Sequence, residues 1–152
     1  MNVAAGLAFG GLTVLVIDMD PQGNATTALG IDHAEGSAGT YEALVDGVPI
    51  GELIQRCPDI SSLWVLPATI DLAGAELGLV ATVSRETKLK TAISTFLHDY
   101  YVDYVIIDCP PSLGLLTLNA LVAAQEIMIP IQCEYYALEG VTQLLRTIEL
   151  VK

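Results

Sequence analysis

The stretch "VLVIDMDPQGNATTALG", residues 14–30, decides the fold of this chain. It begins with an apolar run typical of a buried strand, passes through two acids and a Pro-Gln-Gly-Asn turn, and ends in an Ala/Thr segment that favours a helix. The two acids, Asp18 and Asp20, stand at the carboxyl tip of the predicted strand. A carboxylate at the end of a buried strand is stabilised by a positive charge or a metal ion beside it.

The rest of the chain alternates predicted strands with predicted helices. Strands are predicted at 13–17, 63–66, 103–107 and 126–131. Helices are predicted at 2–9, 24–29, 40–46, 49–56, 70–82, 86–99, 114–124 and from about 138 onward. Strands made of near-continuous Val and Ile runs are buried on both faces, which is typical of parallel sheets. The sequence therefore predicts an α/β fold with a doubly wound, mainly parallel sheet flanked by helices.

Composition limits the class of protein. The chain has 152 residues and 53% of them are hydrophobic, which is enough for one domain with a core. No apolar run has the length of a membrane span, and no Lys or Arg precedes the apolar N-terminal residues, so we expect a soluble, cytoplasmic protein. The net charge of −12 predicts repulsion of nucleic acid and of anionic membranes.

Polar side chains follow three of the predicted strands. They are Asp18 and Asp20 after the first strand, Asp108 and Ser112 after the third, with Pro110 and Pro111 between these two, and Gln132 and Glu134 after the fourth. Ligands bind at the carboxyl ends of the strands in open α/β sheets. Carboxylate oxygens suit Mg²⁺, which typically bridges one or two carboxylates to the phosphates of a substrate. The pattern therefore predicts a nucleotide site with Mg²⁺ at this end of the sheet.

Four motifs resemble those of the ParA/Soj-type partition ATPases, a deviant-Walker group of P-loop NTPases that also contains MinD. They are "VLVIDMDPQGNATTALG" (14–30), "PATIDLAGAE" (67–76), "YVIIDCPPSLGLLTLNAL" (104–121) and "PIQCEYYALEGVTQLL" (130–145). They occur in the family's order and cover essentially the whole chain. The resemblance implies a P-loop NTPase-like fold, an ATPase activity and the cofactors Mg²⁺ and ATP.

The resemblance also implies roles for individual residues. Asp20 matches the acid that helps to position the attacking water, and Asp18 belongs to the same catalytic turn. Asp108 matches the Walker B aspartate, which acts on Mg²⁺ through a water molecule. The segment from Pro111 through Ser112 to Gly114 matches a switch loop that senses the γ-phosphate, and Glu134 is assigned to the same nucleotide and switch set.

One part of the family pattern is not found in these 152 residues. Family members cradle the phosphates with a KGGxGKT-type loop, whereas the first lysine here is Lys88 and no Lys or Arg precedes residue 56. We therefore expect residues 1–152 to be a partial ParA-type nucleotide-binding domain, truncated at both ends and without the central first strand. Such a fragment is expected to be unable to bind or hydrolyse ATP.

Three readings of function stay open. The first is a partition ATPase that works with a ParB-type partner and forms a homodimer in its full length. The second is a non-catalytic fragment that binds other subunits. The third is a MinD-like positioning ATPase at a membrane surface, although "DPQGNATTALG" favours the partition group. We expect these residues to bind neither DNA nor membranes.

Overall fold

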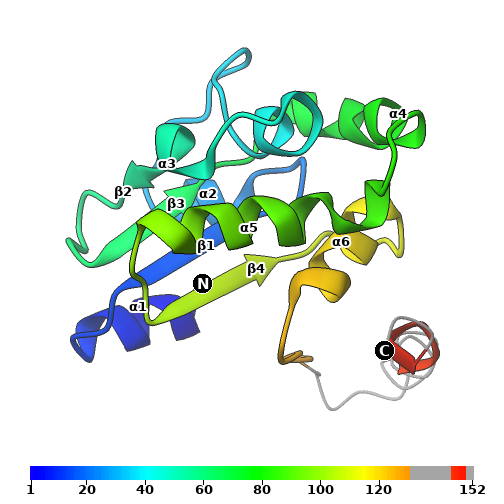
Figure 1. Cartoon of the computed structure of the whole chain (residues 1–152). Coiled ribbons are helices and arrows are strands. Elements are labelled where there is room, and N and C mark those ends of the chain that lie inside the picture. Colours follow the sequence, from blue (N-terminus) through cyan, green and yellow to red (C-terminus); the bar gives the residue numbers. More distant parts are fainter. Residues whose placement is uncertain (131–144, 150–152) are drawn as a thin grey trace.

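The computed structural model describes residues 1–130 and 145–149, and its centre is a four-stranded sheet (Figure 1). The strand order is β2 (Gln55–Arg56), β3 (Leu63–Leu66), β1 (Val14–Asp18) and β4 (Tyr104–Asp108). β1 pairs in parallel with both β3 and β4, and only the short β2 is antiparallel. The prediction of an α/β fold with a mainly parallel sheet is confirmed.

β1 is buried along its whole length because helices cover both faces of the sheet. Val14 and Val16 pack with Ala4 and Ala8 of α1 (Asn2–Phe9) on one face. The alternate side chains, including Leu15 and Ile17, lie in a larger cluster that the other helices form on the opposite face. Full burial of such aliphatic side chains stabilises a fold by about 1.5–3 kcal/mol each.

The remaining helices build the larger cluster and its border. In chain order they are α2 (Asn24–Ala28), the π-helix η1 (Glu42–Asp46), α3 (Ile50–Leu53), the 3-10 helix η2 (Ile70–Gly74), α4 (Ala75–Val80), the 3-10 helix η3 (Arg85–Thr87), α5 (Lys88–Asp99) and α6 (Leu115–Ala123). In Figure 1 the long helix α5 runs along the strands, and its Leu89 and Phe96 belong to the larger cluster. Within the described residues, no helix combines the length and apolar character that crossing a membrane requires.

Two predicted elements differ in the structure. The helix predicted at 49–56 ends at Leu53, because Ile54 is extended and residues 55–56 form β2 against β3. Residues 126–130, predicted as most of a strand, lie in no strand. A strand needs a neighbour for its backbone hydrogen bonds, and no described strand offers one there. Most of the last predicted helix lies outside the described residues. Its described part, residues 145–149, is helical.

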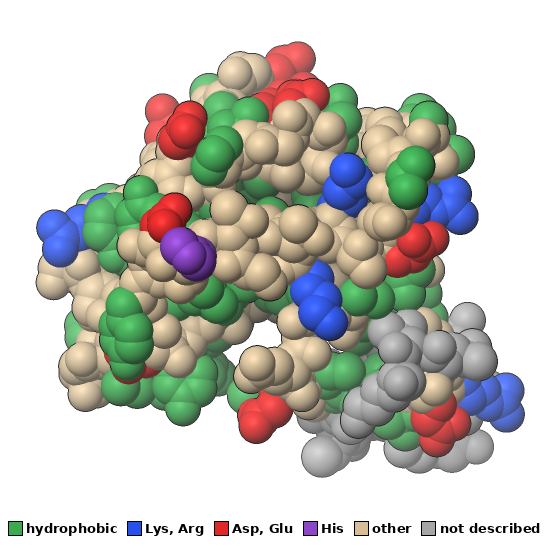
Figure 2. All heavy atoms as spheres, in the orientation of Figure 1, with side chains coloured by type: hydrophobic (Ala, Val, Ile, Leu, Met, Phe, Trp, Pro, Cys, Tyr) green, Lys and Arg blue, Asp and Glu red, His purple; other side chains and the backbone are tan. Residues whose placement is uncertain are grey.

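β4 forms one edge of the sheet. Among the described strands it pairs only with β1, so its other side has no partner strand. Tyr104 is half exposed, and the following residues through Asp108 are only partly buried. Figure 2 shows an opening through the molecule beside this region. The apolar β4 therefore has backbone groups available for pairing with another strand.

The open edge predicts that the 152-residue chain associates with itself. In light scattering coupled to size exclusion, the mass should rise with concentration above that of the monomer. Tyr104→Lys should reduce this association, because a charged side chain on an edge strand disfavours pairing. Thr95→Lys adds the same charge on exposed α5 and should not reduce it. A monodisperse, cooperatively melting monomer at all concentrations would contradict the prediction.

The start of β4 predicts a pH dependence of stability. The Asp103 carboxylate accepts hydrogen bonds from the Thr13 amide (2.7 Å) and the Tyr101 hydroxyl (2.8 Å), and these bonds lower the pKa of Asp103. A lowered pKa in the folded state stabilises the fold above the ordinary carboxyl pKa, and this stabilisation is lost as the pH falls through the lowered value. We expect Asp103→Asn to reduce the melting temperature at pH 7 and to reduce it less at about pH 3. An equal reduction at both pH values would contradict this account.

Candidate functional site

The carboxyl ends of β1 and β4 bring two predicted site residues opposite each other. In the parallel register Asp18 is paired with Asp108, and the Met19 amide just beyond β1 donates to the Asp108 carbonyl (2.8 Å). Asp20 follows two residues after Asp18, so the three acids share one end of the sheet. The predicted convergence of Asp18, Asp20 and Asp108 is therefore what the structure contains.

Asp18 is fully buried, and its carboxylate is held by three hydrogen bonds. Its Oδ1 accepts from the Asp20 amide (3.0 Å). Its Oδ2 accepts from the Thr26 amide (2.9 Å) and from the Thr26 hydroxyl (2.7 Å). These donors replace the water that the buried charge has lost, which is the condition for keeping a carboxylate inside a protein.

Two threonines tie this carboxylate to the rest of the fold. The Thr26 hydroxyl also accepts from the Ala68 amide (3.1 Å), so it joins the end of β1 to the segment after β3. The Thr40 hydroxyl donates to the carbonyls of Asp18 (2.8 Å) and Pro67 (3.1 Å). Sequence analysis missed both residues. One feature of the sequence could have identified Thr26: it is a β-branched residue with a hydroxyl group in the short helix directly after the two acids.

Asp20 lies in the turn between β1 and α2 and is partly exposed. Its Oδ1 accepts from the Gln22 amide (3.0 Å) and its carbonyl accepts from the Gly23 amide (2.8 Å). Gly23 has a positive φ of 62°, which a glycine adopts without strain. The turn therefore fixes the backbone of Asp20 and leaves part of its carboxylate open to solvent.

Asp108 differs from Asp18 because its carboxylate has no hydrogen-bond partner among the described residues, although it is only partly exposed. Burial raises the pKa of Asp108, and the neighbouring charges of Asp18 and Asp20 raise it further. The charge of Asp108 is thus disfavoured by its surroundings. A cation at this end of the sheet would reverse that effect.

The predicted switch loop leads from Asp108 to α6. Pro111 and Ser112 are exposed, and the Ser112 carbonyl accepts from the Thr117 hydroxyl (2.6 Å). At the end of the loop, Glu76 of α4 accepts a hydrogen bond from the Leu115 amide (3.0 Å). A Cβ at Gly114 would overlap the Glu76 carboxylate, so a side chain at this position would displace Glu76 from the bond. Glu76 is a second residue that sequence analysis quoted in a motif without giving it a role.

Asn119 fixes α6 behind the switch loop. Its fully buried side chain accepts from the Leu89 amide (3.2 Å) and donates to the carbonyls of Arg85 (2.9 Å) and Leu115 (3.0 Å). The amide therefore joins α6 to η3 and α5. The loop 111–114 thus lies between two fixed points, the end of β4 and the start of α6.

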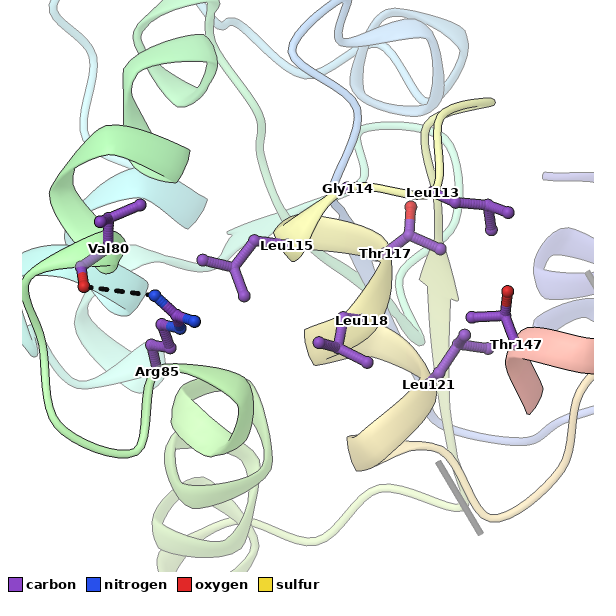
Figure 3. Close-up of a pocket in the computed structure, with 9 residues that line it drawn as sticks. All are labelled: Val80, Arg85, Leu113, Gly114, Leu115, Thr117, Leu118, Leu121 and Thr147. Atoms are coloured by element: carbon purple, nitrogen blue, oxygen red, sulfur yellow. Dashed lines mark hydrogen bonds between the residues drawn. The ribbon is translucent and has the colours of Figure 1, made fainter. Parts of the chain in front are cut away.

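A pocket of about 380 Å³ lies on the other side of the loop (Figure 3). Its walls are mainly apolar residues of α4, the switch loop and α6, including Val80, Leu113 and Leu118. Arg85 lies at its border and donates to the Val80 carbonyl (3.4 Å). None of the three acids lines this pocket, so it is separate from the site at the strand ends.

Among the residues that the structure describes, side chains alone do not form a metal cage. Within residues 1–130 and 145–149, no group of three or more His, Cys, Asp or Glu is placed to hold a metal ion. Asp108 is suited to a magnesium ion whose other ligands are waters and phosphate oxygens, because its carboxylate has no protein partner among the described residues. Glu134 and Gln132 lie outside the described residues.

The sequences of known proteins identify relatives along the whole chain. The family model described as an AAA domain matches residues 1–152. The chain is 53% identical over 152 residues to the Bacillus subtilis protein named sporulation initiation inhibitor protein Soj, and it covers 59% of that protein. It is also 53% identical over 152 residues to the chromosome partitioning protein ParA of Myxococcus xanthus, of which it covers 53%. In both matches all of this chain is covered, so it spans a little over half the length of these relatives.

A solved structure has the same arrangement of elements. It is a crystal structure of cobyrinic acid a,c-diamide synthase from Mycobacterium smegmatis with a bound ATP analogue and magnesium. It matches this chain with a TM-score of 0.89 and 44% identity, over 98% of this chain and 59% of that chain. The chain therefore belongs to the ParA/Soj family of chromosome-partitioning ATPases.

Proposed function

We propose that residues 1–152 are the part of a cytoplasmic ParA-type partition ATPase that carries its magnesium-side and switch residues. In the whole protein, ATP hydrolysis would drive DNA segregation together with a ParB-type partner and through a homodimer. The observation that carries this proposal is the placement of Asp108 at the end of β4 and of Asp20 just beyond the adjacent parallel β1, with the Asp108 carboxylate free of protein partners among the described residues. Family membership supports the same assignment.

Each group has a distinct part in the proposed reaction. Bound Mg²⁺ would neutralise charge on the transferred phosphate, and Asp108 would hold the ion through a water molecule. Asp20 would accept a hydrogen bond from the attacking water, because its carboxylate is partly open and its backbone is fixed by the turn. Residues 111–114 would respond to the presence or absence of the γ-phosphate. Glu76 would hold the end of this loop through its bond with the Leu115 amide.

The same acids explain why we propose that these 152 residues alone are not an active ATPase. Phosphoryl transfer depends on positioning and on charge neutralisation, which a phosphate loop supplies through backbone amides and a lysine. The site residues described at the strand ends are acids, and burial, followed by the neighbouring charges of Asp18 and Asp20, raises the pKa of Asp108. An anionic substrate would meet repulsion from the same charges.

A second candidate function is that of a non-catalytic fragment that binds other subunits. The observation in its favour is the unpaired edge of β4, which offers backbone groups to a further strand. This candidate does not need nucleotide, so it and the ATPase proposal differ in one measurable property, the ATPase activity gained when a phosphate loop and a further C-terminal part are added.

Nucleotide binding to the 152-residue chain tests its proposed inactivity. We expect no measurable affinity for a fluorescent ATP analogue in the presence of Mg²⁺. Adding a family-like upstream strand with its phosphate loop, and a further C-terminal part, should yield a slow ATPase that loses activity in Asp20→Ala and Asp108→Ala. Asp59→Ala, at an exposed position, is the matched control and should keep the activity. Micromolar affinity of the 152-residue chain, abolished by Asp108→Ala, would overturn the proposed inactivity of the fragment.

Charge also predicts the behaviour of this chain toward DNA. The chain has 6 Lys and Arg against 18 Asp and Glu. The face in Figure 2 shows basic side chains separated from one another, without a continuous basic patch. Non-specific affinity for DNA comes mainly from phosphate neutralisation by such side chains. We expect no retention on duplex DNA at low salt, and retention that disappears at moderate salt would contradict this expectation.

A further inference from the structure

The surroundings of Asp18 differ from those of an acid that contacts a ligand. Its side chain has no exposed surface, and three donors already occupy its two oxygens. A metal ion or a substrate water could reach this carboxylate only by displacing the Thr26 hydroxyl or the amides of Asp20 and Thr26. Each displaced donor would be left buried without a partner, which is costly.

The donors to the Asp18 carboxylate come from two places that must stay together for Asp20 to keep its position. The Asp20 amide belongs to the turn, and both Thr26 donors belong to α2. Through its hydroxyl, Thr26 also accepts from the Ala68 amide, which connects this unit to the segment after β3. The Thr40 hydroxyl adds a bond to the Asp18 carbonyl.

Asp20 and Asp108 contrast with Asp18 at the same end of the sheet. Both are partly exposed, and no described residue donates to the Asp108 carboxylate. In Asp20 only Oδ1 is engaged, by the Gln22 amide. The acids thus divide into one that is saturated by the protein and two that have oxygens available for a ligand.

We propose that Asp18 is a positioning residue that forms a buried latch with Thr26, and that this latch holds the Asp20 turn toward the ligand while Asp18 contacts no ligand. The inference rests on the proposed function only for the role of Asp20. The hydroxyl of Thr26 is the specific element of the latch, because it donates to Asp18 and accepts from Ala68 at the same time.

The latch is tested by hydrogen exchange of individual amides in the 152-residue chain. In Asp18→Asn, an NH2 group replaces one oxygen, so either the Asp20 amide, which bonds Oδ1, or the Thr26 amide, which bonds Oδ2, loses its acceptor. We expect the amide that loses its acceptor to exchange about tenfold faster, since a lost buried hydrogen bond lowers the cost of local opening. Thr26→Val should accelerate the Ala68 amide to a similar degree, and Thr26→Ser should restore the wild-type rate.

Matched controls separate a local latch from a general loss of stability. Thr95→Val removes an exposed hydroxyl that bonds only within α5, and it should change none of these rates. Amides within β4 should also keep their rates in the latch variants. If Thr26→Val does not fold, Thr40→Val removes the bond to the Asp18 carbonyl and should accelerate the Asp20 amide. Unchanged rates, or equal acceleration throughout the chain, would overturn the proposal.

Binding of Mn²⁺, followed by the paramagnetic resonance signal of the free ion, tests whether Asp18 contacts a cation. We expect Asp108→Asn to weaken Mn²⁺ binding at least tenfold and Thr26→Ser to leave it unchanged. Loss of Mn²⁺ binding in Asp18→Asn with wild-type exchange of the Asp20 amide would make Asp18 a ligand and overturn the proposal. If the wild-type chain binds no Mn²⁺ in the absence of nucleotide, the exchange rates alone decide for or against the latch.

Discussion

The parallel pairing of β1 with β4 is the constraint on which the site depends. Its register places Asp18 opposite Asp108, and the Met19 amide continues the pairing one residue beyond β1. Side chains alternate along a strand, so a shift of one residue would exchange the two faces of β1 and move Leu15 and Ile17 from the larger cluster to the α1 side. The packing of the core therefore fixes the register, and the register fixes which acids meet at the end of the sheet.

The two paired acids are accommodated in opposite ways. Asp18 lies in a fully buried place with three donors, so its charge is compensated by the protein. Asp108 has no such donors among the described residues, and burial together with the charges of Asp18 and Asp20 raises its pKa. The protein thus stabilises one charge and leaves the other to be stabilised by a ligand. Perturbed groups of this kind are typical of functional sites.

The sequence was sufficient to predict the sheet and its acids because those features have strong local signals. Apolar strands give near-continuous Val and Ile runs, and Asp18 and Asp108 directly end such runs. The latch had no comparable signal, since Thr26 meets Ala68 only after two strands have paired. The contact of Glu76 with Leu115 joins residues 39 positions apart, which no local pattern encodes. Residues 126–130 have the composition of a strand, but composition cannot supply the neighbouring strand that pairing requires.

The open edge and the uncompensated charge lie on the same strand. β4 is the edge of the described sheet and ends at Asp108. A further parallel strand at this edge would end beside Asp108, because the carboxyl ends of parallel strands share one border of a sheet. The loop after such a strand would reach the carboxylate directly. An element added beyond β2 would lie about 19 Å away, since β2, β3 and β1 intervene at roughly 4.8 Å per strand. Positive charge for Asp108 would therefore be supplied most directly from the open side of β4.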